Sequence, residues 1–234
     1  MKVAGFRRDD PVSNMFYLHG FASSPQSGKS NFLSARLAQH GVTLQCPDLN
    51  EPDFSTLTVT RMIEQVEAML VQLLPQQVAL FGSSLGAFVA LHLVERLAHQ
   101  KALGRVRVRQ LILLAPALEF GTSRTGVGDN LLHWKETGWL QVEHHAYGDT
   151  RKVHYELFED ARRYDSFAAV NTVPTLIVQG RRDDVVDPEM VERFSLSRPH
   201  VRFVMVDDGH QLGESLEDVW SESREFLSLS RPRL

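Results

Sequence analysis

A serine stands at the centre of a Gly-x-Ser-x-Gly motif, Gly82-Ser83-Ser84-Leu85-Gly86. Four apolar residues, 78–81, precede the motif, and a helix-compatible apolar run, 87–91, follows it. This pattern predicts a buried strand, a sharp turn that exposes the Ser84 side chain, and a buried helix. The two glycines remove side chains that would collide with the strand and the helix. Ser84 is therefore the candidate nucleophile.

A serine acts as a nucleophile when a base removes its proton and an acid orients that base. His210 follows the strand predicted at 201–206, and Asp183 follows the strand predicted at 174–180. Serine, acid and histidine then come in the chain order that accompanies a nucleophile on a strand-to-helix turn, each on a loop after a strand. We predict that Ser84, Asp183 and His210 form a catalytic triad.

Two other carboxylates share the loop of Asp183. Asp184 would reach the histidine instead if the turn differed by one residue. Asp187 precedes Pro188, which favours the first turn of a helix, so Asp187 is predicted to cap that helix. Asp183 follows Gly180 by three residues, a spacing that favours Asp183 as the acid.

The negative charge that develops on an attacked carbonyl oxygen needs backbone N–H donors. We predict that these donors are Leu85, directly after the nucleophile, and Phe21, directly after the turn His19-Gly20. His19 itself is predicted to be a structural residue of that turn.

Strand and helix patterns alternate along the chain, which predicts an α/β fold with a mostly parallel, doubly wound sheet. The strands are expected at 3–6, 15–18, 42–46, 78–81, 110–115, 174–180 and 201–206. The helices are expected around 32–37, with a stop at Gly41, and at 58–74, 85–94, 188–194 and 216–229.

The alternation stops between residues 119 and 170, in a polar segment that contains several aromatic residues. The segment is too long for a plain connection, because loops beyond about 15 residues usually have structure or a function of their own. We interpret it as an inserted cap, close to Ser84 because the preceding strand ends at the same edge of the sheet. Its aromatic side chains either line a substrate pocket or fill the core of the cap.

Composition limits the remaining possibilities. A chain of 234 residues, 43% hydrophobic, can bury one sizeable core, so residues 1–234 are predicted to form a single domain. The net charge of −4 provides no positive field for nucleic acid, and the basic run 101–109 is interpreted as the solvated start of a strand. The only cysteine, Cys46, excludes an intrachain disulfide. No stretch approaches the roughly 18 apolar residues of a membrane span, and residues 7–10 are polar, so a soluble cytoplasmic protein is expected.

Two other groups of residues resemble a phosphate-binding loop and a metal site, but each lacks a required feature. Gly28-Lys29-Ser30 resembles the end of a phosphate-binding loop, but the required first glycine is replaced by Ser23. The histidines at 133, 144, 145 and 154 lack the helical spacing and the carboxylate of a zinc motif. The sequence therefore predicts no cofactor and no metal.

Several of these motifs together resemble a known family. Tyr17-Leu18-His19-Gly20-Phe21, Ser23-Ser24-Pro25 with Lys29, and the Ser84 motif are similar to the YqiA-type esterases of the α/β-hydrolase superfamily, over roughly the first 95 residues. The loop 180–186 is closer to a general hydrolase pattern. The resemblance implies the α/β-hydrolase fold and hydrolysis of a carboxylic ester with Ser84 as the nucleophile.

The expected function is thus that of a serine hydrolase acting on a small acyl ester or thioester. Two alternatives stay open. An amide or peptide bond could be the target, or the scaffold could be a receptor that binds a ligand without turnover.

Overall fold

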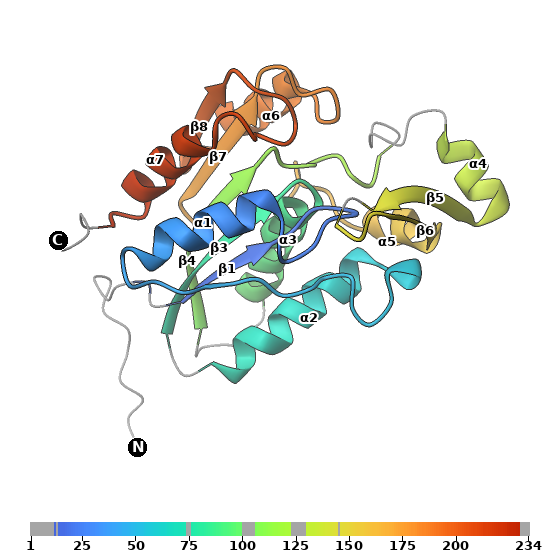
Figure 1. Cartoon of the computed structure of the whole chain (residues 1–234), viewed down its shortest axis with the longest axis horizontal. Coiled ribbons are helices and arrows are strands. Elements are labelled where there is room, and N and C mark those ends of the chain that lie inside the picture. Colours follow the sequence, from blue (N-terminus) through green and yellow to red (C-terminus); the bar gives the residue numbers. More distant parts are fainter. Residues whose placement is uncertain are drawn as a thin grey trace.

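The structure is a computed structural model, which describes residues 12, 14–73, 76–99, 106–122, 130–144 and 146–229. Six parallel strands form one sheet in the order β2-β1-β3-β4-β7-β8 (Figure 1). The predicted α/β class is therefore confirmed, whereas the strand expected at 3–6 lies outside the described residues. The strands are β1 (Asn14–Leu18), β2 (Leu44–Gln45), β3 (Gln76–Ser83), β4 (Val106–Leu114), β7 (Thr175–Gly180) and β8 (Val201–Val206).

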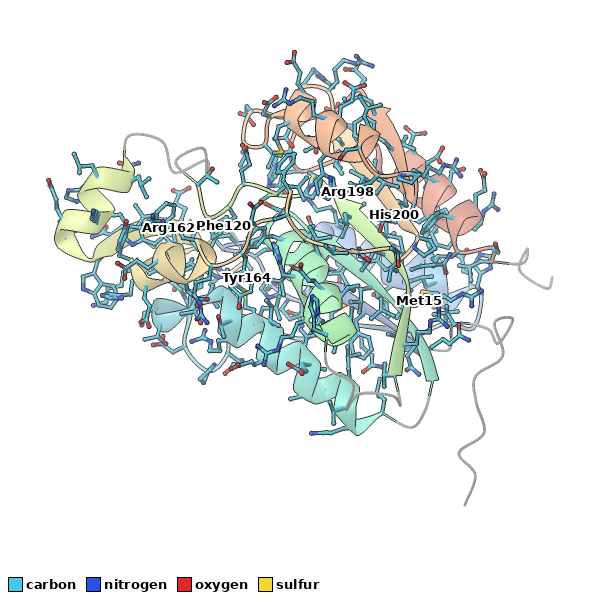
Figure 2. All side chains as sticks on the ribbon, turned by 180° about the vertical axis from the view of Figure 1, so that it is seen from behind. Met15, Phe120, Arg162, Tyr164, Arg198 and His200 are labelled. Atoms are coloured by element: carbon cyan, nitrogen blue, oxygen red, sulfur yellow. The ribbon has the colours of Figure 1, made fainter. Side chains whose placement is uncertain are left out.

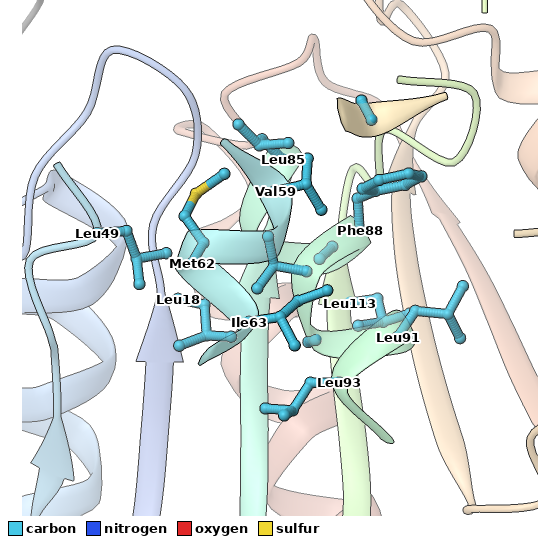
Figure 3. Packing of buried hydrophobic residues seen from close by; sticks show 14 of the residues in the cluster. Leu18, Leu49, Val59, Met62, Ile63, Leu85, Phe88, Leu91, Leu93 and Leu113 are labelled. Atoms are coloured by element: carbon cyan, nitrogen blue, oxygen red, sulfur yellow. The ribbon is translucent and has the colours of Figure 1, made fainter. Parts of the chain in front are cut away.

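Helices cover both faces of this sheet because side chains alternate along each strand. On β3, Val78 and Leu80 join a core with α2 (Val59–Gln72), α3 (Leu85–His99) and α6 (Pro188–Leu196). Ala79 and Phe81 point the other way, into a core with α1 (Gly28–Ala38) and α7 (Leu216–Phe226). Figure 3 shows the first of these cores, where Met62 and other residues of α2 pack near α3.

Side chains and a glycine mark the helix ends. Ser27 accepts from the Ser30 N–H at the start of α1, and Gly41 follows the end of α1 with a φ of +71°. Glycine adopts such a positive φ without strain, so the prediction that the helix ends near Gly41 is confirmed. Asp187 accepts from the Glu189 N–H at the start of α6, which confirms its predicted capping role.

Two strands differ in length from the prediction. The strand expected over 42–46 is only Leu44–Gln45, because β2 is an edge strand with one neighbour and Pro47 lacks an N–H with which to extend the ladder. The strand expected to begin at Gln110 begins at Val106, where it pairs with β3. The part of the basic run that the structure describes is therefore the start of a strand, as expected.

Residues 119–170 include a small structure of their own. It comprises α4 (Asn130–Thr137), β5 (Trp139–His144), β6 (Asp149–His154) and α5 (Glu156–Ala161), and β5 pairs only with β6, antiparallel. Figure 1 shows these elements together at one end of the molecule. Trp134 is buried, with its ring centroid 5.7 Å from that of Tyr155 and 6.3 Å from that of Phe158. We call residues 119–170 the cap.

Polar contacts join the cap to the rest of the fold. The Asp160 carboxylate accepts from the Thr60 N–H at 2.6 Å and from its hydroxyl at 2.7 Å, at the first turn of α2. The Tyr147 hydroxyl donates to Asp48, at 3.2 Å. Phe120 and Tyr164 lie where the cap meets α3 (Figure 2). Within the described ranges, no helix is long and apolar enough to cross a membrane.

Candidate active site

Ser84 lies on the turn between β3 and α3, with a φ of +53°. A non-glycine residue with this backbone costs on the order of 1–3 kcal/mol, so the surrounding structure must hold it. The Ser84 N–H donates to the Leu114 carbonyl at 2.9 Å, and the Ser84 carbonyl accepts from the Ala117 N–H at 3.2 Å. Both bonds tie the turn to the end of β4.

The two glycines of the motif allow this turn to form. A Cβ added to Gly86 would lie 2.0 Å from the Leu18 carbonyl oxygen, and one added to Gly82 would lie 2.5 Å from the Ala87 Cα. Both contacts involve backbone atoms, which cannot move aside as a flexible side chain would. The prediction that side chains at these two positions would collide with the neighbouring strand and helix is therefore confirmed.

The structure brings Ser84, His210 and Asp183 together. His210 Nε2 is 3.0 Å from Ser84 Oγ, and His210 Nδ1 is 2.9 Å from Asp183 Oδ2. An ionised carboxylate only accepts hydrogen bonds, so Nδ1 carries the proton and Nε2 accepts from the serine hydroxyl. This is the tautomer that a general base next to a serine needs.

Asp183 is held as a buried anion. Its side chain is 0% exposed, and it accepts from the Val185 and Val186 N–H groups at 2.9 and 2.8 Å and from Gln179 Nε2 at 2.8 Å. Burial alone would raise the pKa of Asp183, but the bonds from His210 and the two backbone N–H groups outweigh burial and lower it. Asp184 is exposed and makes no hydrogen bond to His210.

The loops that carry Asp183 and His210 touch at a glycine. A Cβ added to Gly180 would lie 2.5 Å from the carbonyl oxygens of Asp208 and Gly209. The Asp208 carboxylate accepts from the Gly209 N–H at 2.7 Å. It also accepts from the Glu214 and Ser215 N–H groups, both at 2.9 Å. Sequence reasoning missed Asp208, which fixes the loop on both sides of His210.

Lys29 reaches the same loop from the start of α1. Its Nζ donates to the Gln211 carbonyl at 2.8 Å and to the Gln211 side chain at 3.1 Å. Burial lowers the pKa of Lys29 to about 8, although the charges of Asp183 and Asp208 act in the opposite direction. The sequence offered one signal for Lys29, namely its place in the motifs that resemble a family.

The backbone before Phe21 lies against Ser84. A Cβ added to Gly20 would be 3.3 Å from the Ser84 Cβ. This proximity arises because β1 and β3 are neighbours at the point where the strand order reverses, which is where open α/β sheets bind ligands. Neither the Phe21 nor the Leu85 N–H donates to another described residue in a turn, loop or cap.

Both ring nitrogens of His19 are hydrogen-bonded to backbone groups, one in the loop after β2 and one in the turn that follows His19. Nε2 accepts from the Leu49 N–H at 2.9 Å, so Nδ1 donates to the Gly20 carbonyl, also at 2.9 Å. That carbonyl belongs to the same peptide unit as the Phe21 N–H. His19 therefore orients this peptide, and its role in the turn is structural.

A cavity of about 300 Å³ opens above Ser84. Phe21 and Met190 line it from the main fold, Phe120 lines it after β4, and Leu140 and Val142 line it from β5 of the cap. Some aromatic residues of the cap line this cavity, and others fill the interior of the cap. Phe120 lines the cavity, whereas Trp134, Tyr155 and Phe158 fill the cap.

A second serine–histidine–carboxylate set lies where the end of the cap packs on α3. His92 Nε2 is 3.2 Å from Ser166 Oγ, and His92 Nδ1 is 3.3 Å from Glu95. Such a contact resembles part of a triad, yet Ser166 is 1% and His92 2% exposed, and neither lines a described cavity. Burial lowers the pKa of His92, with the nearby Glu95 acting against it. We interpret this set as a buried polar contact between α3 and the chain after α5.

The described residues hold no group of three or more His, Cys, Asp or Glu side chains that converge on a metal position. Gly28-Lys29-Ser30 forms the start of α1, with Lys29 directed to Gln211. His145 lies outside the described residues.

The architecture is that of the α/β-hydrolases. A protein assigned as a hydrolase, from Agrobacterium vitis S4, matches with a TM-score of 0.81 and 23% identity over 96% of this chain and 91% of that one. Est1E from Butyrivibrio proteoclasticus, with ferulic acid bound, matches with a TM-score of 0.69 and 19% identity over 95% and 91%. The esterase Pf2001 from Pyrococcus furiosus matches with 0.66 and 18% over 93% and 83%. At these identities the likeness shows the fold.

The family of the chain follows from its sequence. The model of the uncharacterised protein family UPF0227 matches residues 14–226, so the chain belongs to that family. This family is YqiA-like, which confirms the resemblance seen in the motifs. A comparison with curated proteins found no match.

Proposed function

We propose that the protein is a serine hydrolase that cleaves a carboxylic ester or thioester through a covalent acyl-enzyme. The observation that carries this proposal is the continuous set of hydrogen bonds from Ser84 through His210 to Asp183, beside a cavity. The fold alone would not support it, because α/β folds host many functions.

In the first half of the reaction, Ser84 Oγ attacks the substrate carbonyl carbon while its proton passes to His210 Nε2. The imidazolium that forms carries a positive charge, and the buried Asp183 carboxylate stabilises it. The charge on the carbonyl oxygen is taken up by the N–H groups of Phe21 and Leu85. Because the turn at Ser84 and the turn after β1 already hold these groups, little reorganisation accompanies the attack.

The tetrahedral intermediate then collapses and the bond to the leaving group breaks. His210 donates its proton to the departing oxygen or sulfur, leaving Ser84 acylated. A water molecule gives a proton to His210 and attacks the acyl carbon, which forms a second tetrahedral intermediate. When the bond between Ser84 Oγ and the acyl carbon breaks, His210 returns its proton to Ser84 Oγ and the carboxylic acid leaves. Each proton taken up by His210 is thus returned, and these steps use no cofactor.

The cavity supports a substrate with an apolar acyl or aryl part. Phe21, Phe120, Leu140 and Val142 present apolar surface next to Ser84. A volume of about 300 Å³ lies at the small end of the range for ligand pockets. A small or medium acyl group therefore fits the enclosed part better than a large one.

The test is a panel of p-nitrophenyl esters of graded chain length, with the corresponding thioesters and p-nitroanilides. We expect turnover of esters and thioesters and at least about 100-fold slower turnover of anilides. Faster anilide cleavage would identify an amide hydrolase. Saturable binding of the compounds without turnover would identify a receptor and contradict the proposal.

A further inference from the structure

A second cavity, of about 390 Å³, lies on the cap. Its walls come from α4, β5 and β6, and its lining does not include Ser84. Asn130, Leu140 and Gln141 line both this cavity and the one above Ser84. Strand alternation places Leu140 and Val142 on the face of β5 toward the cavity above Ser84, and Trp139 and Gln141 on the other face, toward the second cavity. The two cavities therefore lie on opposite faces of β5 and meet at its edge beside Asn130, around which a substrate whose ester bond is at Ser84 can extend into the second one.

The second cavity differs from the first in its polar groups. Lys152 supplies a positive charge, and the side chains of Asn130, His133 and Gln141 supply N–H groups that donate hydrogen bonds. No carboxylate is among its lining residues in the part of the chain that the structure describes. A wall with one cation, several donors and no acid favours an anionic ligand.

The position of Lys152 supports this interpretation. Lys152 pairs with Gln141 across the β5–β6 hairpin, and strand alternation places Trp139 and Glu143 on the same face as Gln141. The Lys152 ammonium lies over the Trp139 ring, 4.3 Å from its centroid, and within the described ranges it makes no ion pair, not even with Glu143. The ammonium therefore lies at the wall of the second cavity, beside Trp139, where a ligand can reach it.

We propose that this second cavity is a subsite for an anionic group, a carboxylate or a phosphate, carried by the substrate at the end remote from the ester bond. The inference rests on the proposed ester hydrolysis at Ser84, and it adds the class of substrate. Lys152 is a specificity-determining residue in this account, with Trp139 as the flat wall beside which the anion binds. Because Lys152 is exposed, its contribution should be a few-fold and should weaken with added salt.

The experiment compares matched substrates on the full chain. p-Nitrophenyl hemiesters of dicarboxylic acids provide a carboxylate at graded distances from the ester, and p-nitrophenyl esters of ω-phosphoalkanoic acids provide a phosphate. Neutral p-nitrophenyl alkanoates of equal length are the reference. We expect one anionic series to exceed its neutral reference in kcat/KM at the chain length that spans β5, and the better series identifies carboxylate or phosphate.

Two variants distinguish binding of the anion by Lys152 from a general effect of removing one positive charge from the cap. Lys152→Gln should lower kcat/KM for the preferred anionic ester about fivefold, mainly through KM, and change the neutral ester by less than twofold. Lys135→Gln removes the same charge from α4, at an exposed residue that lines neither cavity, and should change neither ester.

The outcomes distinguish the two proposals. If neutral esters are hydrolysed but Lys152→Gln leaves the anionic preference unchanged, or Lys135→Gln reduces it equally, the subsite is wrong and the hydrolase proposal stands. If neither neutral nor anionic esters are hydrolysed by the wild-type protein, the hydrolase proposal itself fails.

Discussion

The turn at Ser84 and the cap are built in different ways. At the turn, backbone hydrogen bonds to β4 and glycine contacts as close as 2.0 Å to a neighbouring backbone atom leave one conformation. The cap instead has its own two-stranded sheet and is joined to the main fold by side-chain contacts such as Asp160 to Thr60 and Tyr147 to Asp48. The difference indicates that backbone geometry fixes the position of Ser84, whereas side-chain contacts hold the cap against the main fold.

Two buried polar side chains show the same contrast. Asp183, beside Ser84, accepts hydrogen bonds from His210, Gln179 and two backbone N–H groups. His144, at the end of β5, is 1% exposed, and neither of its ring nitrogens has a partner among the described residues. An unpaired buried polar group costs stability, so His144 is a local cost within the cap.

Apart from loss of the proposed nucleophile itself, the largest expected effect comes from the acid of the proposed triad. Asp183→Asn should lower kcat on p-nitrophenyl esters by about 10⁴-fold, because an amide no longer fixes the tautomer of His210 or stabilises its charged form. Asp184→Asn removes the neighbouring, exposed carboxylate and should cost less than a few-fold. If Asp184→Asn silences the enzyme and Asp183→Asn does not, the acid has been assigned one residue too early.

A change in the cap should alter selectivity and spare the chemistry. Leu140→Trp adds volume to the wall of the cavity, so we expect kcat/KM for long-chain p-nitrophenyl esters to fall about tenfold relative to the acetate. Leu132→Trp makes the same change on α4 at a residue that is 65% exposed and lines neither cavity. Equal chain-length profiles for the two variants would show that the cap does not select the substrate. Deleting the whole cap is less informative, since Asp160 also bonds the first turn of α2.

A smaller effect is expected at the start of α6. Asp187→Ala removes the side chain that accepts from the Glu189 N–H, and loss of such a cap costs about 1 kcal/mol of unfolding free energy. Urea unfolding measures the change, and Glu192→Ala, exposed on the same helix, is the control. An unfolding free energy equal to that of the control would mean that the Asp187 side chain contributes nothing measurable to the stability of α6.

The smallest expected effect is a pH dependence in the cap. Burial, with the charge of Arg151, lowers the pKa of His144, so the unfolded chain binds a proton more readily than the folded one. The free energy of unfolding then falls as the pH drops below about 6.5. His144→Phe retains ring contacts to Tyr147 and Phe54 and removes the titration, so it should lose less stability than the wild type between pH 7 and pH 5. His154→Phe, in the same hairpin and more exposed, should follow the wild type, and a variant of His144 that does so too would contradict the account.

Much of the main fold could be predicted because its signals are local. The apolar runs, the glycines around Ser84 and the spacing from Gly180 to Asp183 each lie within a few residues of the feature that they determine. The roles of Lys29 and Asp208 could not be predicted in this way. Lys29 acts on Gln211, 182 residues away, and the contact appears only when the sheet brings α1 beside the loop of His210.

The cap was predicted only as a segment, and the reason is physical. Its elements are short, and its aromatic residues divide between filling its interior, as Trp134 does, and lining the cavity, as Phe120 does. No periodicity distinguishes these two uses. The edge strand β2 was overestimated for a related reason, since the apolar run alone does not show that only one neighbour is present to pair with it.

The central claim is that Ser84, and not the buried Ser166, is the nucleophile. The direct test is labelling with a fluorophosphonate probe followed by mass spectrometry, together with turnover of a p-nitrophenyl ester. We predict that the label is on Ser84 in the wild type, that Ser84→Ala loses the label and at least about 10⁴-fold in kcat, and that Ser166→Ala keeps both. A label on Ser166 or Ser83, or a Ser84→Ala variant that is still labelled and active, would contradict the account.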